Sequence, residues 1–325
     1  MESPEPGAIR GAVEILRGGG IVAFPTETVY GLGADAFNPG AVARVFMAKG
    51  RPPDNPLIVH IAHAEQLRDL AAVVPPDAER LAERFWPGPL TMVLKRKSSV
   101  PDIVTAGLDT VAARIPRHNV PLALIRELSR GIVGPSANAS GRPSPTTAEH
   151  VYSDLNGRID MILDAGPTPL GLESTVIDLT TRVPTLLRFG GLSREQIEGV
   201  IGPVRTTEEE DGLKRSPGTR HRHYAPRAKV VLIEQGDDSQ IRMLYGEYSR
   251  KGNIVGCIVH GIRPLEDLAP ERWIALPPQA EAVARSLFAS LRELDSLGVD
   301  VILIEKVPET GIGAAIMDRL RRAAE

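Results

Sequence analysis

Short apolar runs alternate with amphipathic segments along most of the chain. Ile9, Val13 and Leu16 share one face of a predicted helix that stops at three glycines, and residues 21–24 then read as a buried strand. Further strands are expected over 57–61, 90–94, 111–115, 131–134, 161–163, 175–179 and 185–189, and helices over 39–49, 77–85, 122–128 and 147–155. This alternation predicts an α/β fold with a mixed, twisted sheet rather than a helical bundle or a sandwich.

Two helix starts carry clear local signals. Asn38-Pro39 combines an N-cap amide with a proline in the first turn. Ser193-Arg194-Glu195-Gln196 has the spacing of a capping box and should open the last helix of the N-terminal unit.

The pattern breaks over residues 203–227, where an acidic run at 208–211 precedes a basic, histidine-bearing run at 220–223. Such a segment buries little apolar area, so it reads as an interdomain linker. Beyond it, strands at 230–233, 254–259 and 301–304 alternate with helices at 239–249, 280–297 and 313–323. We therefore expect a domain over 1–204, a linker over 205–228, and a smaller three-layer, Rossmann-like domain over 229–325. The last domain has no Gly-x-Gly-x-x-Gly, so no dinucleotide is inferred there.

Composition narrows the classes of function without selecting one. A chain of 325 residues with 42% hydrophobic and 24% charged residues is ordinary for a globular protein of two domains. The net charge of −3 gives no general case for nucleic-acid binding. No apolar stretch approaches a membrane span and the N-terminus lacks a signal-peptide pattern, so the cytoplasm is the expected location. Cys257 is the only cysteine and lies in an apolar run, which predicts a core residue.

Several familiar catalytic arrangements are missing from the sequence. There is no Gly-x-x-x-x-Gly-Lys-Ser/Thr phosphate loop, and residues 134–138 lack the second glycine of a nucleophile elbow. The histidines of the N-terminal unit have no metal-ligand spacing, so no protein-ligated metal is expected. What remains suits a reaction that depends on positioning and charge stabilisation.

Three polar segments follow predicted strands or helices. Phe24-Pro25-Thr26-Glu27-Thr28-Val29-Tyr30-Gly31-Leu32-Gly33 continues the first strand and would deliver polar groups to the carboxyl edge of the sheet, although many strand ends are only polar turns. Lys49-Gly50-Arg51-Pro52-Pro53-Asp54-Asn55-Pro56-Leu57 presents two cations on a loop stiffened by prolines. These cations suit a polyphosphate, or they merely satisfy the dipole at the end of a helix. Ser136-Ala137-Asn138 is either a polar turn or an anion cradle.

These three segments, in this order, resemble the Sua5/YrdC family, the threonylcarbamoyl-adenylate synthases that begin N6-threonylcarbamoyladenosine (t6A) formation on tRNA. The resemblance is strong over about the first two hundred residues, and the remainder is similar to the extra domain of the longer, Sua5 branch. It implies a YrdC-like mixed sheet for the first domain.

The resemblance also implies the nucleotide half of a site. Lys49 and Arg51 would be the catalytic cations. The residues implied to bind ATP are Arg51, Asn55, Thr110, Ser136, Asn138, Ser144, Arg188 and Tyr224. In the family the linker folds back over the site, which is where Tyr224 belongs. From the residues alone, Arg188 is equally an ordinary surface charge, and His221 and His223 read as part of a solvated tether.

The threonine half is inferred from a second set. Arg114 follows an apolar strand, where a planar guanidinium would suit an amino-acid carboxylate, although an exposed strand-end arginine is the plain alternative. His60 is a lone histidine in an apolar strand, a position more typical of a core residue. The residues that the resemblance implies for threonine binding are Thr28, His60, Arg114, Gly134 and Ser174.

The expected reaction joins L-threonine, bicarbonate or CO2, and ATP into threonylcarbamoyl-AMP with release of pyrophosphate. ATP is then a substrate, and Mg²⁺ would be held by phosphates and water rather than by protein ligands. The product would pass to a tRNA threonylcarbamoyltransferase complex. Two alternatives remain open at this point: weak binding of double-stranded RNA or tRNA without catalysis, and carbamoyl-adenylate formation. An aromatic content of 4% argues against base stacking as a main mode of binding.

Overall fold

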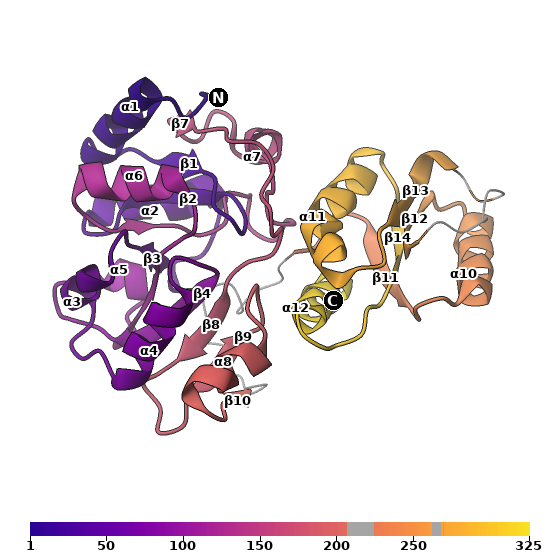
Figure 1. Cartoon of the computed structure of the whole chain (residues 1–325). Coiled ribbons are helices and arrows are strands. Elements are labelled where there is room, and N and C mark those ends of the chain that lie inside the picture. Colours follow the sequence, from indigo (N-terminus) through magenta and orange to yellow (C-terminus); the bar gives the residue numbers. More distant parts are fainter. Residues whose placement is uncertain (207–223, 262–267, 269) are drawn as a thin grey trace.

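The computed structural model describes residues 1–206, 224–261, 268 and 270–325. A larger N-terminal body built on one mixed sheet packs beside a smaller body that holds the C-terminus (Figure 1). Most of the predicted linker, residues 207–223, lies outside the described residues. Among the residues described, no helix is long and apolar enough to cross a bilayer.

The N-terminal body is organised by one sheet whose order, in the described part of the chain, is β10-β9-β8-β4-β5-β3-β6-β2-β1-β7. Its strands are β1 (Val22–Phe24), β2 (Gly31–Asp35), β3 (Ile58–His60), β4 (Leu90–Lys95), β5 (Thr110–Arg114), β6 (Ile132–Val133), β7 (Met161–Ile162), β8 (Thr175–Asp178), β9 (Thr185–Arg188) and β10 (Arg205–Thr206). β3 and β5 are parallel, while β4 and β5, and β3 and β6, are antiparallel. The predicted mixed α/β sheet is therefore confirmed.

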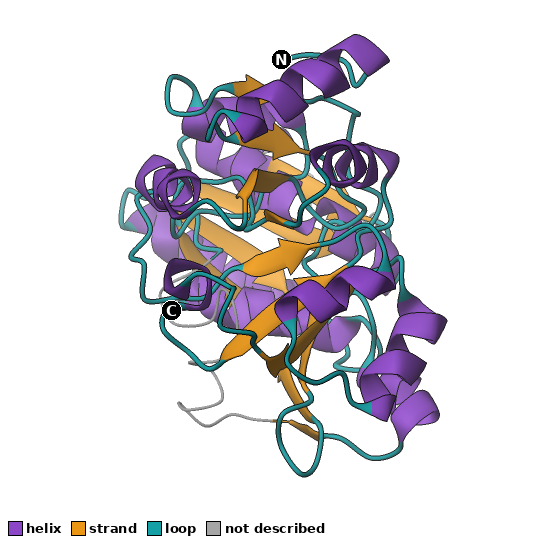
Figure 2. Cartoon of the chain, turned by 90° about the vertical axis from the view of Figure 1, so that its left-hand side faces the viewer, coloured by secondary structure: helices purple, strands orange, loops and turns teal. Residues whose placement is uncertain are grey.

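Helices cover this sheet, as the view turned toward the N-terminal body shows (Figure 2). They are α1 (Pro6–Arg17), α2 (Pro39–Lys49), the 3-10 turn η1 (Ala64–Gln66), α3 (Leu67–Leu70), α4 (Pro76–Phe85), α5 (Asp102–Thr105), α6 (Asn119–Leu128), α7 (Ala148–Leu155) and α8 (Arg194–Ile201). Both predicted helix starts are confirmed. The Asn38 side chain accepts from the N–H of Ala41, and Ser193 and Gln196 form the reciprocal capping box.

The segment after β1 differs from the sequence-based expectation. The polar loop ends at Tyr30, and residues 31–33 begin β2, which pairs antiparallel with β1. The two glycines of this strand face the Phe24 ring: a Cβ built on Gly31 or Gly33 would lie 2.9 or 2.8 Å from it. They therefore make room for an aromatic core side chain, and residues 31–33 belong to a second strand rather than to the polar segment that follows β1.

The C-terminal body has three layers. In the residues described, its parallel sheet has the order β11-β14-β12-β13, with β11 (Lys229–Ile233), β12 (Val255–His260), β13 (Trp273–Leu276) and β14 (Val301–Glu305). Its helices are α10 (Asp238–Arg250), the 3-10 turn η2 (Pro270–Arg272), α11 (Ala280–Ser296) and α12 (Gly313–Ala324). Alternate β14 residues enter separate apolar clusters, Val301 with α10 and Ile302 with α11 and α12. The predicted Rossmann-like arrangement is confirmed, and β13 is an edge strand that the pattern missed.

Cys257 lies inside β12 and is 1% exposed. Burial raises the pKa of its thiol to about 12, so it is neutral and unreactive at physiological pH. The prediction of a core residue is confirmed.

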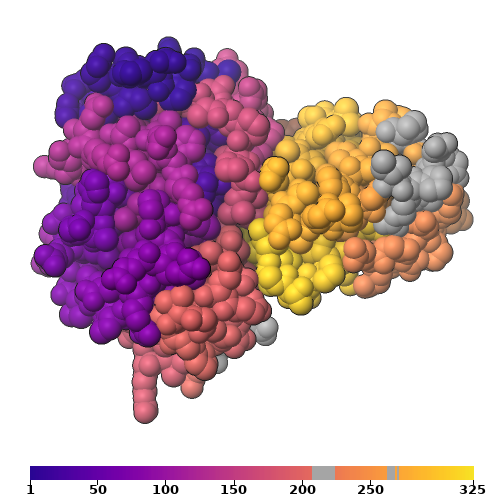
Figure 3. Space-filling model, in the orientation of Figure 1, coloured from indigo at the N-terminus to yellow at the C-terminus, as the bar shows by residue number. Residues whose placement is uncertain are grey.

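The two bodies share one apolar cluster. Val29 and Leu172 of the N-terminal body are buried together with Leu287 and Phe288 of α11. Figure 3 shows the resulting close contact between the two bodies. Arg292 of α11 also crosses the interface and donates from Nη2 to Asp154 Oδ2 at 2.7 Å. The C-terminal body is therefore packed onto the loops that follow β1 and precede β8.

Candidate functional site

One pocket in the N-terminal body collects residues from segments that are distant in the sequence. Among the residues predicted for the nucleotide, the pocket is lined by Lys49, Arg51, Ser136, Asn138, Ser144, Arg188 and Tyr224. Among those predicted for threonine, it is lined by Thr28, His60, Arg114, Gly134 and Ser174. The structure thus brings both predicted sets to one place, at the ends of β3, β5, β6 and β9.

Two predicted residues are not among those that line the pocket. The Asn55 side chain is fully buried, and its backbone carbonyl accepts a hydrogen bond from Arg51 Nη2 at 3.1 Å. Thr110 is buried at the start of β5, opposite Lys95, whereas Arg114 ends the same strand about 13 Å away at 3.3 Å per residue. Direct contact of either side chain with a nucleotide stays a prediction.

Lys49 ends α2 and is 3% exposed. Its ammonium donates to the backbone carbonyls of Ser136 and Asn138, the latter at 2.7 Å. These bonds tie the end of α2 to the turn after β6. Burial, assisted by the positive charge of Arg51, holds the pKa of Lys49 well below its ordinary value.

We expect this depressed pKa to make ATP binding take up a proton. A bound polyphosphate restores the charged form of Lys49, so the complex holds more protons than the free enzyme between the two pKa values. Affinity for ATP should consequently fall as pH rises through that window. Calorimetry in buffers of different ionisation enthalpy, at a pH where ATP is fully ionised, would measure the uptake. The Lys49→Met variant should lose it, and unchanged uptake in that variant would contradict the assignment.

Arg51 follows α2 and is 8% exposed. Nη2 donates to the carbonyls of Asn55 and Pro56, both at 3.1 Å. Nε has no hydrogen-bond partner within the described residues. Burial lowers the pKa of Arg51 to about 10, which still leaves the guanidinium charged at neutral pH. The side chain is therefore fixed by backbone carbonyls while part of its donor capacity remains for a ligand.

Arg188 ends β9 and is anchored to the loop before β8. Its Nη2 donates to the Ser174 carbonyl at 2.9 Å and to the Ser174 hydroxyl at 3.1 Å. The same hydroxyl lies 2.8 Å from Thr91 Oγ1. Burial lowers the pKa of Arg188, yet Glu173 and Tyr224 oppose that effect. A further fixed cation thus lines the pocket, at the end of β9.

The loop between β1 and β2 is held by its own hydroxyls. Thr26 Oγ1 accepts from the N–H of Thr28 at 3.0 Å and donates to the Val29 carbonyl at 2.7 Å. Thr28 Oγ1 in turn accepts from Arg114 Nη1 at 3.0 Å. Arg114 also forms an ion pair with Glu27 at 2.6 Å, and both side chains are buried. Arg114 is therefore preoriented by neighbours on two sides.

His60 ends β3 and is 2% exposed. Burial and the charge of Arg114 hold its pKa well below the ordinary value, so the imidazole is neutral at physiological pH. Its Nδ1 has no partner among the residues described. Gly134 packs directly on the ring, since a Cβ at that position would lie 2.9 Å from it. A neutral ring with a spare nitrogen can donate to or accept from a small polar substrate.

Glu173 is the one carboxylate among the residues lining this pocket in the described part of the chain. It accepts from the Ser144 hydroxyl and forms an ion pair with Arg319 Nε of α12 at 2.9 Å. These contacts and Arg188 hold the pKa of Glu173 below its ordinary range despite burial, which acts in the opposite direction. Sequence reasoning assigned no role to Glu173, Glu27 or Arg319. The only local signal was that Glu173 stands next to Ser174 in the sequence. The arginine partners Arg319 and Arg114 are too distant in sequence to be linked to Glu173 and Glu27.

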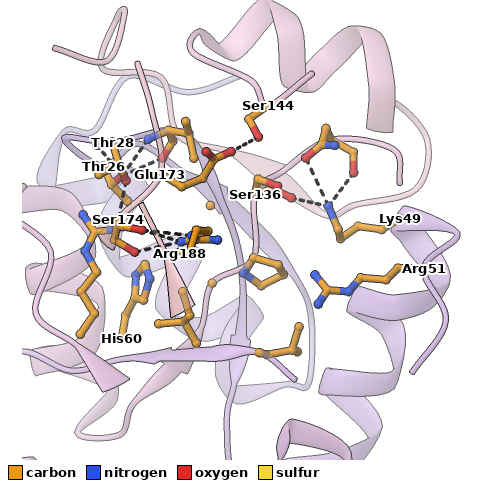
Figure 4. A pocket seen from close by; sticks show the side chains of 18 of the residues that line it. Thr26, Thr28, Lys49, Arg51, His60, Ser136, Ser144, Glu173, Ser174 and Arg188 are labelled. Atoms are coloured by element: carbon orange, nitrogen blue, oxygen red, sulfur yellow. Dashed lines mark hydrogen bonds between the residues drawn. The ribbon is translucent and has the colours of Figure 1, made fainter. Parts of the chain in front are cut away.

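The pocket carries an excess of positive charge. Its lining cations are Lys49, Arg51, Arg114, Arg142 and Arg188. Figure 4 shows Lys49 and Arg51 on one side, Thr28, Ser174 and His60 on the other, and Arg188 and Glu173 between them. The end with Lys49 and Arg51 is thus suited to phosphates, and the end with Thr28 and His60 to a small zwitterion. The hydroxyls of Ser136 and Ser144 also line the pocket.

The described residues contain no group of three or more His, Cys, Asp or Glu side chains arranged to hold a metal ion. Glu27 and Glu173, which lie beside predicted threonine and nucleotide residues, are each paired with an arginine.

Comparison with known proteins agrees with this geometry. A family model described as telomere recombination, covering Sua5, YciO and YrdC, matches residues 14–190. A second model, the C-terminal domain of threonylcarbamoyl-AMP synthase, matches residues 192–325. The chain is 49% identical to the threonylcarbamoyl-AMP synthase of Pyrococcus abyssi, over 99% of this chain and 96% of that protein. It is 47% identical to the enzyme of the same name from Bacillus subtilis, over 96% and 92% of the two chains.

The fold also matches solved structures. The crystal structure of P. abyssi Sua5 complexed with L-threonine superposes with a TM-score of 0.93, at 49% identity, covering 98% of this chain and 95% of that one. The agreement extends over both bodies, including the C-terminal three-layer unit. It therefore covers the pocket and the helices α11 and α12 of the second body that pack beside it.

Proposed function

The chain belongs to the threonylcarbamoyl-AMP synthase family in its long, Sua5-type form, and from that premise we propose that its pocket joins L-threonine, bicarbonate and ATP into threonylcarbamoyl-AMP. The observation that carries the assignment of the site is the gathering of five cationic side chains around one carboxylate in the pocket lining. Such an excess of fixed charge suits a triphosphate and an amino-acid carboxylate. The reaction is the first step of t6A formation on tRNA.

The reaction has two steps, carbamate formation and adenylate formation. The threonine amine adds to CO2, which forms from bicarbonate and a proton with loss of water, and gives N-carboxythreonine with release of a proton. A carbamate oxygen then attacks the α-phosphorus of ATP, forming the phosphorus–oxygen bond of the mixed anhydride as the bond to pyrophosphate breaks. No protein nucleophile takes part, so the enzyme acts by positioning and by offsetting charge.

We assign the threonine end to Arg114, Thr28, His60, Gly134 and Ser174. Arg114 is buried and preoriented, so it can receive the substrate carboxylate without reorganisation. His60 is neutral and has a spare nitrogen for the threonine hydroxyl or amine. The tight packing of Gly134 on this ring leaves no space for a side chain there.

We assign the nucleotide end to the remaining predicted residues: Lys49, Arg51, Asn55, Thr110, Ser136, Asn138, Ser144, Arg188 and Tyr224. Lys49, Arg51 and Arg188 would offset charge on the phosphates as pyrophosphate leaves. Magnesium would enter with ATP and be held by phosphate oxygens and water, because the one carboxylate that lines the described part of the pocket, Glu173, is paired with Arg319.

Pyrophosphate release in the presence of ATP should require threonine and bicarbonate together. Purified protein would be assayed with each component omitted in turn, and the product identified by mass spectrometry as threonylcarbamoyl-AMP. Carbamoyl phosphate offered in place of threonine and bicarbonate serves as the control for the alternative carbamoyl-adenylate reaction. Release that is indifferent to threonine, or that depends on carbamoyl phosphate, would refute the proposal.

The unstable product would be passed to a tRNA threonylcarbamoyltransferase complex. Because ATP, threonine and the tRNA substrate of that complex meet in the cytoplasm, we place the enzyme there.

A further inference from the structure

The C-terminal body supplies a charged side chain to the edge of the pocket. Arg319 lies on α12, is fully buried, and donates from Nε to Glu173 Oε2 at 2.9 Å. The other oxygen of Glu173 accepts from the Ser144 hydroxyl. A chain of two contacts thus runs from the second body to a hydroxyl that lines the pocket.

The same guanidinium holds Tyr224. The Arg319 Cζ lies 5.1 Å from the centroid of the Tyr224 ring. That ring stacks on Phe288 of α11, with centroids 5.4 Å apart and 24° between the planes. Tyr224 adopts a φ of 66°, a conformation that non-glycine residues rarely hold without support. Two helices of the C-terminal body therefore fix a tyrosine that lines the pocket.

Charge explains why Glu173 needs a partner. An unpaired carboxylate in the pocket lining would repel the phosphates that the neighbouring cations attract. Burial alone would lower the pKa of Arg319, but Tyr224, Glu173 and Asp318 raise it above its ordinary value. Arg319 is consequently a permanent cation, and it cancels the negative charge of Glu173 while leaving its oxygens as hydrogen-bond acceptors.

Docking of the two bodies does not depend on this contact alone. Arg292 bonds to Asp154 and to the Pro143 carbonyl, Arg285 donates to the Pro169 carbonyl at 2.9 Å, and a shared apolar cluster surrounds them. Both of these arginines lie on α11, whereas Arg319 lies on α12. The Arg319–Glu173 pair is therefore one of several interface contacts, and it differs from the α11 arginine contacts in that its partner, Glu173, lines the pocket.

We propose that Arg319 is a positioning residue for the nucleotide half of the site: it neutralises Glu173, thereby orienting Ser144, and it fixes the ring of Tyr224. The inference rests on the proposed function, because it assigns these residues to nucleotide binding. It makes nucleotide affinity conditional on the C-terminal body, whereas the threonine end is built from the N-terminal body.

The test is a double-mutant cycle on the full chain with a matched interface control. Arg319→Met should raise the Kd for a non-hydrolysable ATP analogue and the KM for ATP by about 30- to 100-fold, because it leaves Glu173 charged beside the phosphates. The KM for threonine and kcat should change far less. Glu173→Gln should cost less than Arg319→Met, since glutamine keeps an oxygen for the Ser144 donor. The double variant Arg319→Met/Glu173→Gln should bind the ATP analogue at least tenfold more tightly than Arg319→Met alone.

Arg285→Met removes an arginine from the same interface and should leave nucleotide affinity within about twofold of the unmodified protein. A double variant no better than Arg319→Met, or equal losses in Arg319→Met and Arg285→Met, would overturn the proposal in favour of simple docking. Should Arg319→Met fail to fold, Arg319→Lys, which keeps the charge but loses the planar contact with Tyr224, must show an intermediate loss. Failure of the proposed function is distinguishable: the unmodified protein would then bind the analogue without releasing pyrophosphate in response to threonine.

Discussion

Arg51→Gln is expected to lower kcat/KM for ATP by about 10²- to 10³-fold, the usual cost of removing one preorganised group that stabilises charge in a transition state. Arg51 is held in place by the carbonyls of Asn55 and Pro56, so its side chain does not have to reorient during the reaction. Its pKa of about 10 keeps it charged at neutral pH. Glutamine retains one donor for these carbonyls but carries no charge into the pocket.

The effect should appear mainly in kcat, because charge on the leaving pyrophosphate grows as the reaction proceeds. Steady-state pyrophosphate release at varied ATP and saturating threonine measures it. Arg44→Gln is the matched control: Arg44 lies on α2, pairs with Asp160 at 3.0 Å and is 40% exposed. Activity of Arg51→Gln within a few-fold of that control would show that Arg51 does not act on the phosphates.

Local signals in the sequence were sufficient for much of the fold. The Asn38 and Ser193 caps bond within three residues of themselves, so nothing outside the segment is needed to recognise them. Buried strands such as β14 are continuous apolar runs and differ from their predicted bounds by a residue or so. These elements are determined by periodicity and by short-range hydrogen bonds.

Elements determined by tertiary context were missed or misread. Gly31 and Gly33 resemble a turn because neither has a side chain, but their requirement comes from the Phe24 ring of the neighbouring strand. The edge strand Trp273–Leu276 is only partly buried, so it lacks a strong apolar signal. Neither feature can be recognised before the partner strand is known.

The candidate site divides in the same way. The cations and hydroxyls were found because they stand in short motifs that resemble a known family, and the pocket brings most of them together. The carboxylates that pair with these arginines were not found. Glu27 meets Arg114 and Glu173 meets Arg319 only through the packing of separate strands and of the second body. A motif identifies groups that meet a ligand, whereas the groups that hold them in place depend on the whole fold.

Arg114→Met is expected both to abolish measurable threonine binding and to destabilise the N-terminal body. The substitution removes the cation assigned to the substrate carboxylate and leaves Glu27 as a buried, uncompensated charge. Breaking one side of a buried ion pair typically costs about 3–5 kcal/mol. For a chain of this size that corresponds to a fall in Tm of roughly 6–20 °C, at about 2–4 °C per kcal/mol.

The two effects can be separated by a second substitution at Glu27. In Glu27→Gln/Arg114→Met the buried charge is gone, so most of the lost stability should return, while threonine binding should remain absent because no cation faces the carboxylate. Thermal unfolding and calorimetric titration with threonine measure the two quantities independently. Arg117→Met is the control: Arg117 is exposed just beyond the same strand and donates to the Pro87 carbonyl. If the double variant bound threonine normally, Arg114 would serve only to neutralise Glu27 and the assigned threonine end of the pocket would be wrong.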